Sequence, residues 1–109
     1  MKISKITETY SVSGQIYPED MPAIKEAGFK TIMCNRPDGE SVDQPTAKII
    51  QKAAAKHGMK FFHVPIGDAG VELETLMSFS KVMSSGKNPI LAYCNTGGRC
   101  TRLWDAFQA

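Results

Sequence analysis

Residues 89–101 form a stretch that reads Pro89-Ile90-Leu91-Ala92-Tyr93-Cys94-Asn95-Thr96-Gly97-Gly98-Arg99-Cys100-Thr101. Its apolar first part predicts a buried strand, its glycine-containing middle predicts a tight loop, and residue 101 onward predicts a short last helix. The N–H groups of such a loop and the positive end of the helix dipole both stabilise negative charge. The stretch therefore places Cys94 where a thiol becomes a nucleophile with a lowered pKa.

Arg99 follows Cys94 in a Cys-x4-Arg pattern. A cation near the start of a helix meets the positive end of the dipole, so an arginine there is best explained by pairing with an anion. We predict Cys94 and Arg99 as catalytic residues; the alternative for Cys94 is a buried structural cysteine. The loop residues between them are expected to bind the anionic substrate: Asn95, Thr96, Gly97 and Gly98.

Extended and helical signals alternate on the N-terminal side of this stretch. Strands are expected at residues 10–14, 29–34, 59–66 and 89–94, and helices at residues 22–27, 45–57 and 71–83. Alternating strands and helices imply right-handed crossovers and a mostly parallel sheet covered on both faces. We therefore predict an α/β fold with three α/β/α layers.

The most reactive positions of the chain lie at the carboxyl ends of the predicted strands. Ligands bind at these ends in parallel sheets. Cys34, Cys94 and the loop 67–70 all fall at such ends, and the polar segment 35–44, with Arg36, leaves the same edge. We expect Arg36 to bind substrate. Asp68 is either the N-cap of the next helix or a general acid that protonates a leaving group.

The composition bounds the class of protein. The 109 residues fit one domain, 1–109, and 42% hydrophobic with 22% charged residues is ordinary for a globular protein. A net charge of +2 without a basic run argues against nucleic-acid and membrane partners, so any basic patch should be local. No apolar segment resembles a membrane span or a secretion signal, and we expect a cytoplasmic protein.

The three cysteines form no Cys-x2-Cys pair, which argues against a metal site, and we expect no cofactor. An odd number of cysteines fits free thiols in a reducing compartment. Cys34 and Cys100 are each candidates for a redox partner of Cys94, with core packing as the alternative. The short last helix carries apolar Leu103, Trp104 and Phe107, which a homo-oligomer would cover.

Several blocks of the chain resemble one known family. They are Val12-Ser13-Gly14-Gln15, Ala27-Gly28-Phe29-Lys30-Thr31-Ile32, Asn35-Arg36-Pro37-Asp38-Gly39-Glu40, Gln44-Pro45, His63-Val64-Pro65-Ile66 and Leu91-Ala92-Tyr93-Cys94. Together they resemble DUF442, the phosphatase-like domain of beta-lactamase-hydrolase-like proteins, from about Tyr10 to Trp104. That family is similar in fold to dual-specificity phosphatases, which implies a four-stranded parallel sheet with helices on both faces. Dual-specificity phosphatases often hold the general acid in a Pro-Ile-x-Asp segment, which Pro65-Ile66-Gly67-Asp68 resembles.

The resemblance leaves two kinds of chemistry open. Phosphatases of that fold carry His-Cys-x5-Arg, whereas this chain has Tyr93 before the cysteine and one residue fewer before Arg99. A loop of this length resembles that of rhodaneses, which hold a cysteine persulfide, and DUF442 domains can be fused to persulfide-dioxygenase-like domains. The leading expectation is a phosphatase-like hydrolase that forms a phosphocysteine on Cys94. The alternatives are a rhodanese-like sulfurtransferase with a sulfane-sulfur substrate and a persulfide-dioxygenase-like partner, and a non-catalytic anion- or redox-sensing module.

Overall fold

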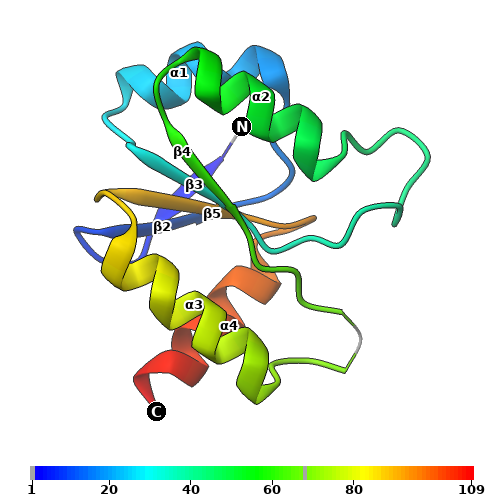
Figure 1. Ribbon diagram of the computed structural model, residues 1–109, viewed down its shortest axis with the longest axis vertical. Coiled ribbons are helices and arrows are strands. Elements are labelled where there is room, and N and C mark those ends of the chain that lie inside the picture. The colour runs from blue at the N-terminus through cyan, green and yellow to red at the C-terminus, as the bar shows by residue number, and fades with distance from the viewer. Residues whose placement is uncertain (1, 68) are drawn as a thin grey trace.

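The computed structural model describes residues 2–67 and 69–109 and contains a five-stranded sheet in the order β1-β2-β5-β3-β4 (Figure 1). The strands are β1 (Ile3–Lys5), β2 (Tyr10–Ser13), β3 (Thr31–Cys34), β4 (Lys60–His63) and β5 (Ile90–Tyr93). Strands β2, β5, β3 and β4 are parallel, as predicted, whereas β1 pairs antiparallel with β2.

The predicted α/β fold is confirmed, but the sheet has five strands rather than the expected four. The additional strand, β1, has three residues, of which two are exposed. A short edge strand of this kind carries too little apolar alternation to be recognised from sequence.

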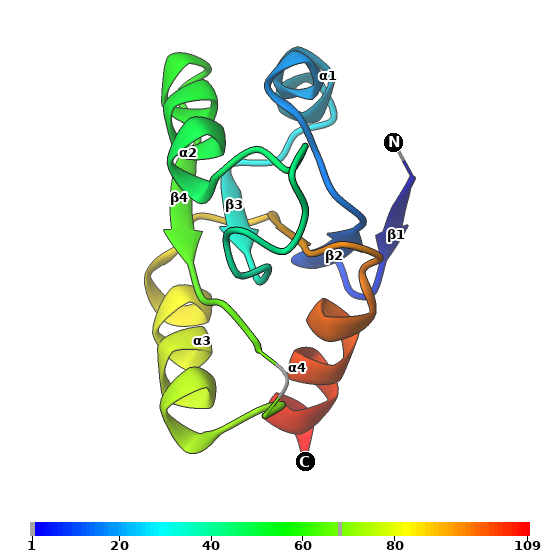
Figure 2. The same cartoon turned by 90° about the vertical axis from the view of Figure 1, so that its right-hand side faces the viewer.

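The helices form two layers, one on each face of the sheet (Figures 1 and 2). The short 3-10 helix η1 (Pro18–Asp20) leads into α1 (Met21–Glu26), which shares one face with α2 (Ala47–Lys56). The other face carries α3 (Leu73–Ser85) and α4 (Gly98–Gln108). Helix α2 begins where the Thr46 hydroxyl accepts a hydrogen bond from the amide of Ile49, which satisfies an otherwise unpaired donor.

Strands β2, β3 and β5 are buried along their whole length, so the core divides into a cluster on each side of the sheet. Below α3 and α4, Trp104 stacks on Tyr10 with ring centroids 4.9 Å apart, and Phe107 meets Phe79 at 5.0 Å. Leu103 is fully buried in the same cluster. The apolar side chains that favoured a homo-oligomer therefore pack within the chain, and the homo-oligomer stays a prediction without that support.

No helix in the described ranges has both the length and the apolar character needed to cross a bilayer.

Backbone hydrogen bonds join the carboxyl ends of the three central strands. The amide of Asn35, after β3, donates to the carbonyl of Tyr93 in β5 at 2.8 Å. On the other side, the amide of Cys94 donates to the carbonyl of Ser13, the last residue of β2, at 3.3 Å. The segments that follow β2, β3 and β5 consequently meet at one edge of the sheet, where the sequence places the reactive residues.

Candidate active site

The cysteine loop, residues 94–99, connects the buried strand β5 to helix α4. Gly97 precedes the helix with φ +92°, a left-handed conformation that a residue with a side chain rarely adopts. Helix α4 begins at Gly98, three residues earlier than the sequence predicted, so Arg99 and Cys100 lie in its first turn. The earlier start directs the first amides of the helix back toward the end of β5.

Gly14 allows this loop to approach the end of β2 closely. A Cβ atom at Gly14 would lie 2.9 Å from the carbonyl oxygen of Asn95, closer than side chains are found in proteins. The amide of Gln15 donates to the same carbonyl at 3.3 Å. A glycine after β2 is therefore a structural condition for the conformation of the cysteine loop.

The sulfur of Cys94 is surrounded by hydrogen-bond donors. The amide nitrogen of Gly97 lies 3.0 Å from the sulfur, and the residue is fully buried. Burial raises the pKa of Cys94. Its effect is outweighed by a hydrogen bond from the Cys100 thiol, which lowers this pKa most, and by bonds from the amides of Cys100, Thr96 and Arg99. Together they lower the pKa of Cys94 to about 4, so the sulfur is a thiolate at neutral pH.

The other two cysteines remain protonated. Burial raises the pKa of Cys34 and raises that of Cys100 well above its ordinary value. Cys100 lies beside Cys94 in the cluster under α3 and α4, whereas Cys34 belongs to the cluster under α1 and α2 and donates to the carbonyl of Arg36 at 3.3 Å. Cys100 is thus the thiol in direct contact with Cys94, and a redox role for either residue stays a prediction.

Titration of the thiols tests this arrangement. Ultraviolet absorbance of the thiolate should show a single acidic transition near pH 4, which Cys94→Ser removes. Because the Cys100 thiol is the largest cause of the lowered pKa, Cys100→Ala should move the transition upward by about one to two units, the value of one hydrogen bond to a charged group. Cys100→Ser retains a hydrogen-bond donor, so its transition should stay close to the wild-type pH. A wild-type transition near pH 8 or 9 would refute the thiolate assignment.

Arg99 forms a bidentate ion pair with Glu40. Its two terminal nitrogens each lie 2.8 Å from a carboxylate oxygen, and one of them also donates to the carbonyl of Ile66 at 3.0 Å. Glu40 raises the pKa of Arg99 most, and the neighbouring Cys94 sulfur raises it further. Three of the five guanidinium N–H donors are used by these bonds, which leaves two for the sulfur or for a bound anion.

Glu40 also binds Arg36, whose Nε lies 3.0 Å from the carboxylate. The Arg36 side chain is only 7% exposed, and it donates to the side chain of Gln15 at 2.9 Å. Hydrogen bonds from Arg99 first, and then from Arg36, lower the pKa of Glu40 to about 2. Arg36 therefore supports the carboxylate that positions Arg99, and its direct contact with substrate stays a prediction.

Sequence reasoning missed the role of Glu40. The residue closes the Asn35-Arg36-Pro37-Asp38-Gly39-Glu40 block, but its partner Arg99 lies 59 residues away. The only signal was that an arginine at the start of a helix requires an anion. That anion is Glu40 in this structure.

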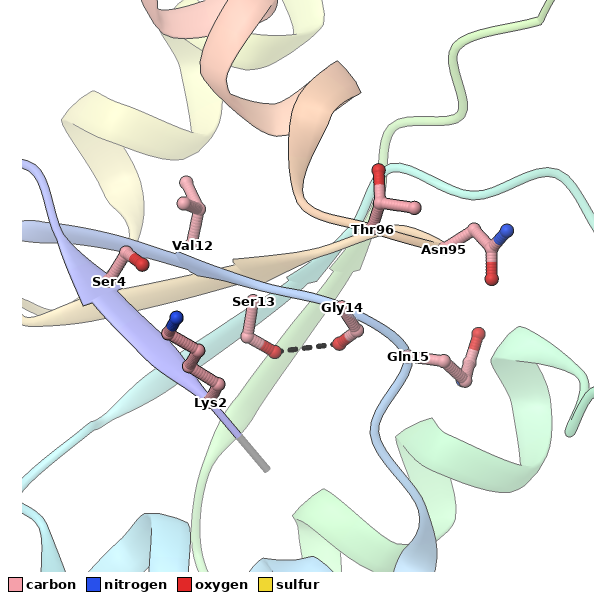
Figure 3. A pocket seen from close by; sticks show the side chains of 8 residues that line it. All are labelled: Lys2, Ser4, Val12, Ser13, Gly14, Gln15, Asn95 and Thr96. Carbon is pink, nitrogen blue, oxygen red and sulfur yellow. Dashed lines mark hydrogen bonds between the residues drawn. The ribbon is translucent and has the colours of Figure 1, made fainter.

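A polar pocket of about 440 Å³ adjoins the cysteine loop (Figure 3). The loop contributes Asn95 and Thr96 to the lining. Ser13 and Gln15 come from the end of β2, and Lys2 comes from the residue before β1. Hydroxyl, amide and ammonium groups dominate its lining.

The predicted general acid, Asp68, lies outside the described residues. Among the described residues, no group of three or more His, Cys, Asp or Glu side chains is placed to hold a metal ion.

The model of the phosphatase-like domain of beta-lactamase hydrolase-like proteins matches residues 2–109 of the chain. This chain belongs to that family. The resemblance seen in the sequence is confirmed. A curated beta-lactamase hydrolase-like protein of Agrobacterium fabrum is 31% identical over 104 residues, which are 95% of this chain and 24% of the relative. The phosphatase-like domain described by this chain thus spans about a quarter of the length of that curated relative.

Solved structures show the same fold for this beta-lactamase hydrolase-like domain. A candidate phosphatase from Neisseria meningitidis is 35% identical, with a TM-score of 0.87 over 95% of this chain and 74% of the other. The catalytic domain of the PP-IP phosphatase Siw14 from S. cerevisiae matches with a TM-score of 0.66 at 17% identity, over 97% of this chain and 73% of the other. The domain therefore has a cysteine-phosphatase fold.

Proposed function

We propose that this domain is a cysteine-dependent phosphatase-like hydrolase. The observation that carries the proposal is the Cys94 sulfur, a thiolate held by the amides of the cysteine loop next to the Arg99 guanidinium. A thiolate is a strong nucleophile, and amides aimed at one point stabilise the negative charge of a phosphoryl group. Membership of a phosphatase-like family and the phosphatase fold support the same chemistry.

In the proposed reaction the Cys94 sulfur attacks phosphorus, the sulfur–phosphorus bond forms and the bond to the leaving oxygen breaks. The leaving oxygen takes a proton, for which Asp68 is the proposed donor. Loop amides and the two remaining Arg99 donors bind the equatorial oxygens. Water then attacks the phosphocysteine, which releases phosphate and restores the thiolate.

The pocket beside the cysteine loop supports a small polar substrate. Its volume of about 440 Å³ is that of a ligand site rather than of an extended protein interface. Hydroxyl groups from Ser4, Ser13 and Thr96, with the ammonium of Lys2, match a hydroxylated leaving group better than an apolar one. We infer that the substrate is a small, hydroxylated phosphate ester.

A second function is favoured by the thiol of Cys100, which is hydrogen-bonded to Cys94. Cys94 would attack the outer sulfur of thiosulfate, forming a persulfide and releasing sulfite, and a thiol acceptor would then take the sulfane sulfur. In that reaction the Cys100 thiol would also help the persulfide to pass its outer sulfur to the acceptor, a step that phosphoryl transfer lacks. The domain would then act beside a persulfide-dioxygenase-like partner.

Two parallel assays decide between these functions. Reduced protein is incubated with an aryl phosphate and, separately, with thiosulfate and cyanide, and Cys94→Ser is run as the control. Phosphate release that disappears in the variant supports the hydrolase, and thiocyanate formation that disappears supports the sulfurtransferase. The absence of both would contradict both and leave an anion- or redox-sensing module.

A further inference from the structure

Four lysines line one pocket at the amino ends of the strands, whereas the cysteine loop lies at their carboxyl ends. The lysine pocket, as we call it, has a volume of about 300 Å³ and contains Lys25, Lys30, Lys60 and Lys87. All four are exposed, and no aspartate or glutamate is among the residues that line the pocket. They are four of the 13 basic residues in a chain of net charge +2, so this pocket is a local concentration of positive charge.

The topology of the sheet brings these lysines together. Lys60 begins β4 and its amide donates to the carbonyl of Lys30, which precedes β3, at 3.0 Å. Lys87 precedes β5 on the other side, where its carbonyl accepts a hydrogen bond from the Thr31 hydroxyl at 2.7 Å. Lys30, Lys60 and Lys87 therefore form a row across three adjacent strands, and the backbone positions of this row span about 10 Å, twice the spacing of neighbouring strands.

Negative groups of the protein itself neutralise only part of the positive charge of these four lysines. Lys25 donates to the carbonyl of His57 at the end of α2, and the helices α1, α2 and α3 all end near the amino ends of the strands. Three helix ends together contribute about one and a half negative charges, fewer than the four positive charges present. In the described part of the chain the ion pairs are Lys5–Glu8, Arg36–Glu40 and Arg99–Glu40, and none includes these lysines.

We propose that the lysine pocket binds a compact polyanion that carries two or more phosphoryl groups. A row of this length exceeds what one phosphate can contact, and the pocket is too small for a folded partner. Because it lies at the opposite end of the strands from Cys94, the site is separate from the proposed reaction and does not depend on it.

Inorganic tripolyphosphate is the probe, added to the whole chain at about 0.15 M salt, where long-range attraction is screened. Amide resonances of residues 28–29 and 58–59 should shift, and calorimetry should show weaker binding of inorganic phosphate. The variant Lys30→Glu/Lys60→Glu should bind tripolyphosphate at least about tenfold more weakly. The matched control, Lys48→Glu/Lys52→Glu on the exposed side of α2, carries the same change in charge and should bind normally.

Three results would overturn the proposal. They are shifts confined to residues 94–99, equal weakening in both double variants, and the absence of binding at this salt concentration. Circular dichroism checks the fold of the variants, and Lys30→Gln/Lys60→Gln replaces the charge reversal if that variant does not fold. Aryl-phosphate hydrolysis by the lysine variants is expected to be unchanged, so a failure of this proposal is distinguishable from a failure of the proposed function.

Discussion

Cys94→Ser is expected to lower the rate of aryl-phosphate hydrolysis at least about 1,000-fold, because a hydroxyl has no ionised form at neutral pH to attack phosphorus. The loss should appear in kcat, measured at saturating substrate. Cys34→Ser is the matched control, since it makes the same substitution in the opposite core cluster and keeps a donor for the carbonyl of Arg36. Retention of the wild-type rate by Cys94→Ser would refute the mechanism.

The same variant should change how stability depends on pH. The folded pKa of Cys94, about 4, lies below its ordinary value of 9.0, so the unfolded chain binds more protons between these values. The free energy of unfolding should therefore rise with pH from about 4 to 9 in the wild type, and this rise should be missing in Cys94→Ser. Glu40, with a pKa of about 2 against 4.5, contributes its own rise at lower pH. Urea unfolding across this range measures the difference.

Arg99→Lys should lower kcat about 100-fold with a smaller change in KM, because a lysine cannot bind Glu40 and a phosphoryl group at the same time through a planar fork. Glu40→Gln should lower kcat by about tenfold, since it loosens Arg99 without removing the guanidinium. Arg102→Lys, on an exposed position of the same helix, is the matched control and should retain the wild-type rate. Equal rates in Arg99→Lys and Arg102→Lys would show that Arg99 takes no part in catalysis.

The parts of the fold that depend on local patterns were predictable. Strand-like residue patterns followed by turn residues predict β2, β3, β4 and β5, and the glycines after Cys94 predict the strand-to-helix turn. The start of α4 was misplaced because Gly98 and Arg99 carry no apolar periodicity, while the loop geometry makes them helical. Strand β1 escaped detection for a similar reason, since its pairing with β2 is tertiary.

The contacts that complete the site depend on register and on distant residues. Cys34 and Tyr93 are register partners in β3 and β5 and share one face of the sheet, which separates Cys34 from Cys94. The sequence does not indicate that separation. Cys34 and Cys94 both lie at the carboxyl end of a strand, and the face that each occupies depends on how the two strands are aligned. The bond between Glu40 and Arg99 likewise joins two loops that only the fold brings together.

The mass of the peptide that contains Cys94 shows whether the Cys94 thiolate attacks the substrate. Wild-type protein is mixed with an aryl phosphate, quenched in acid during turnover and digested. During turnover this peptide should gain one phosphoryl group, and the corresponding peptide of Cys94→Ser should gain none. An unmodified Cys94 peptide at every quench time, while phosphate is released at the full rate, would contradict this mechanism.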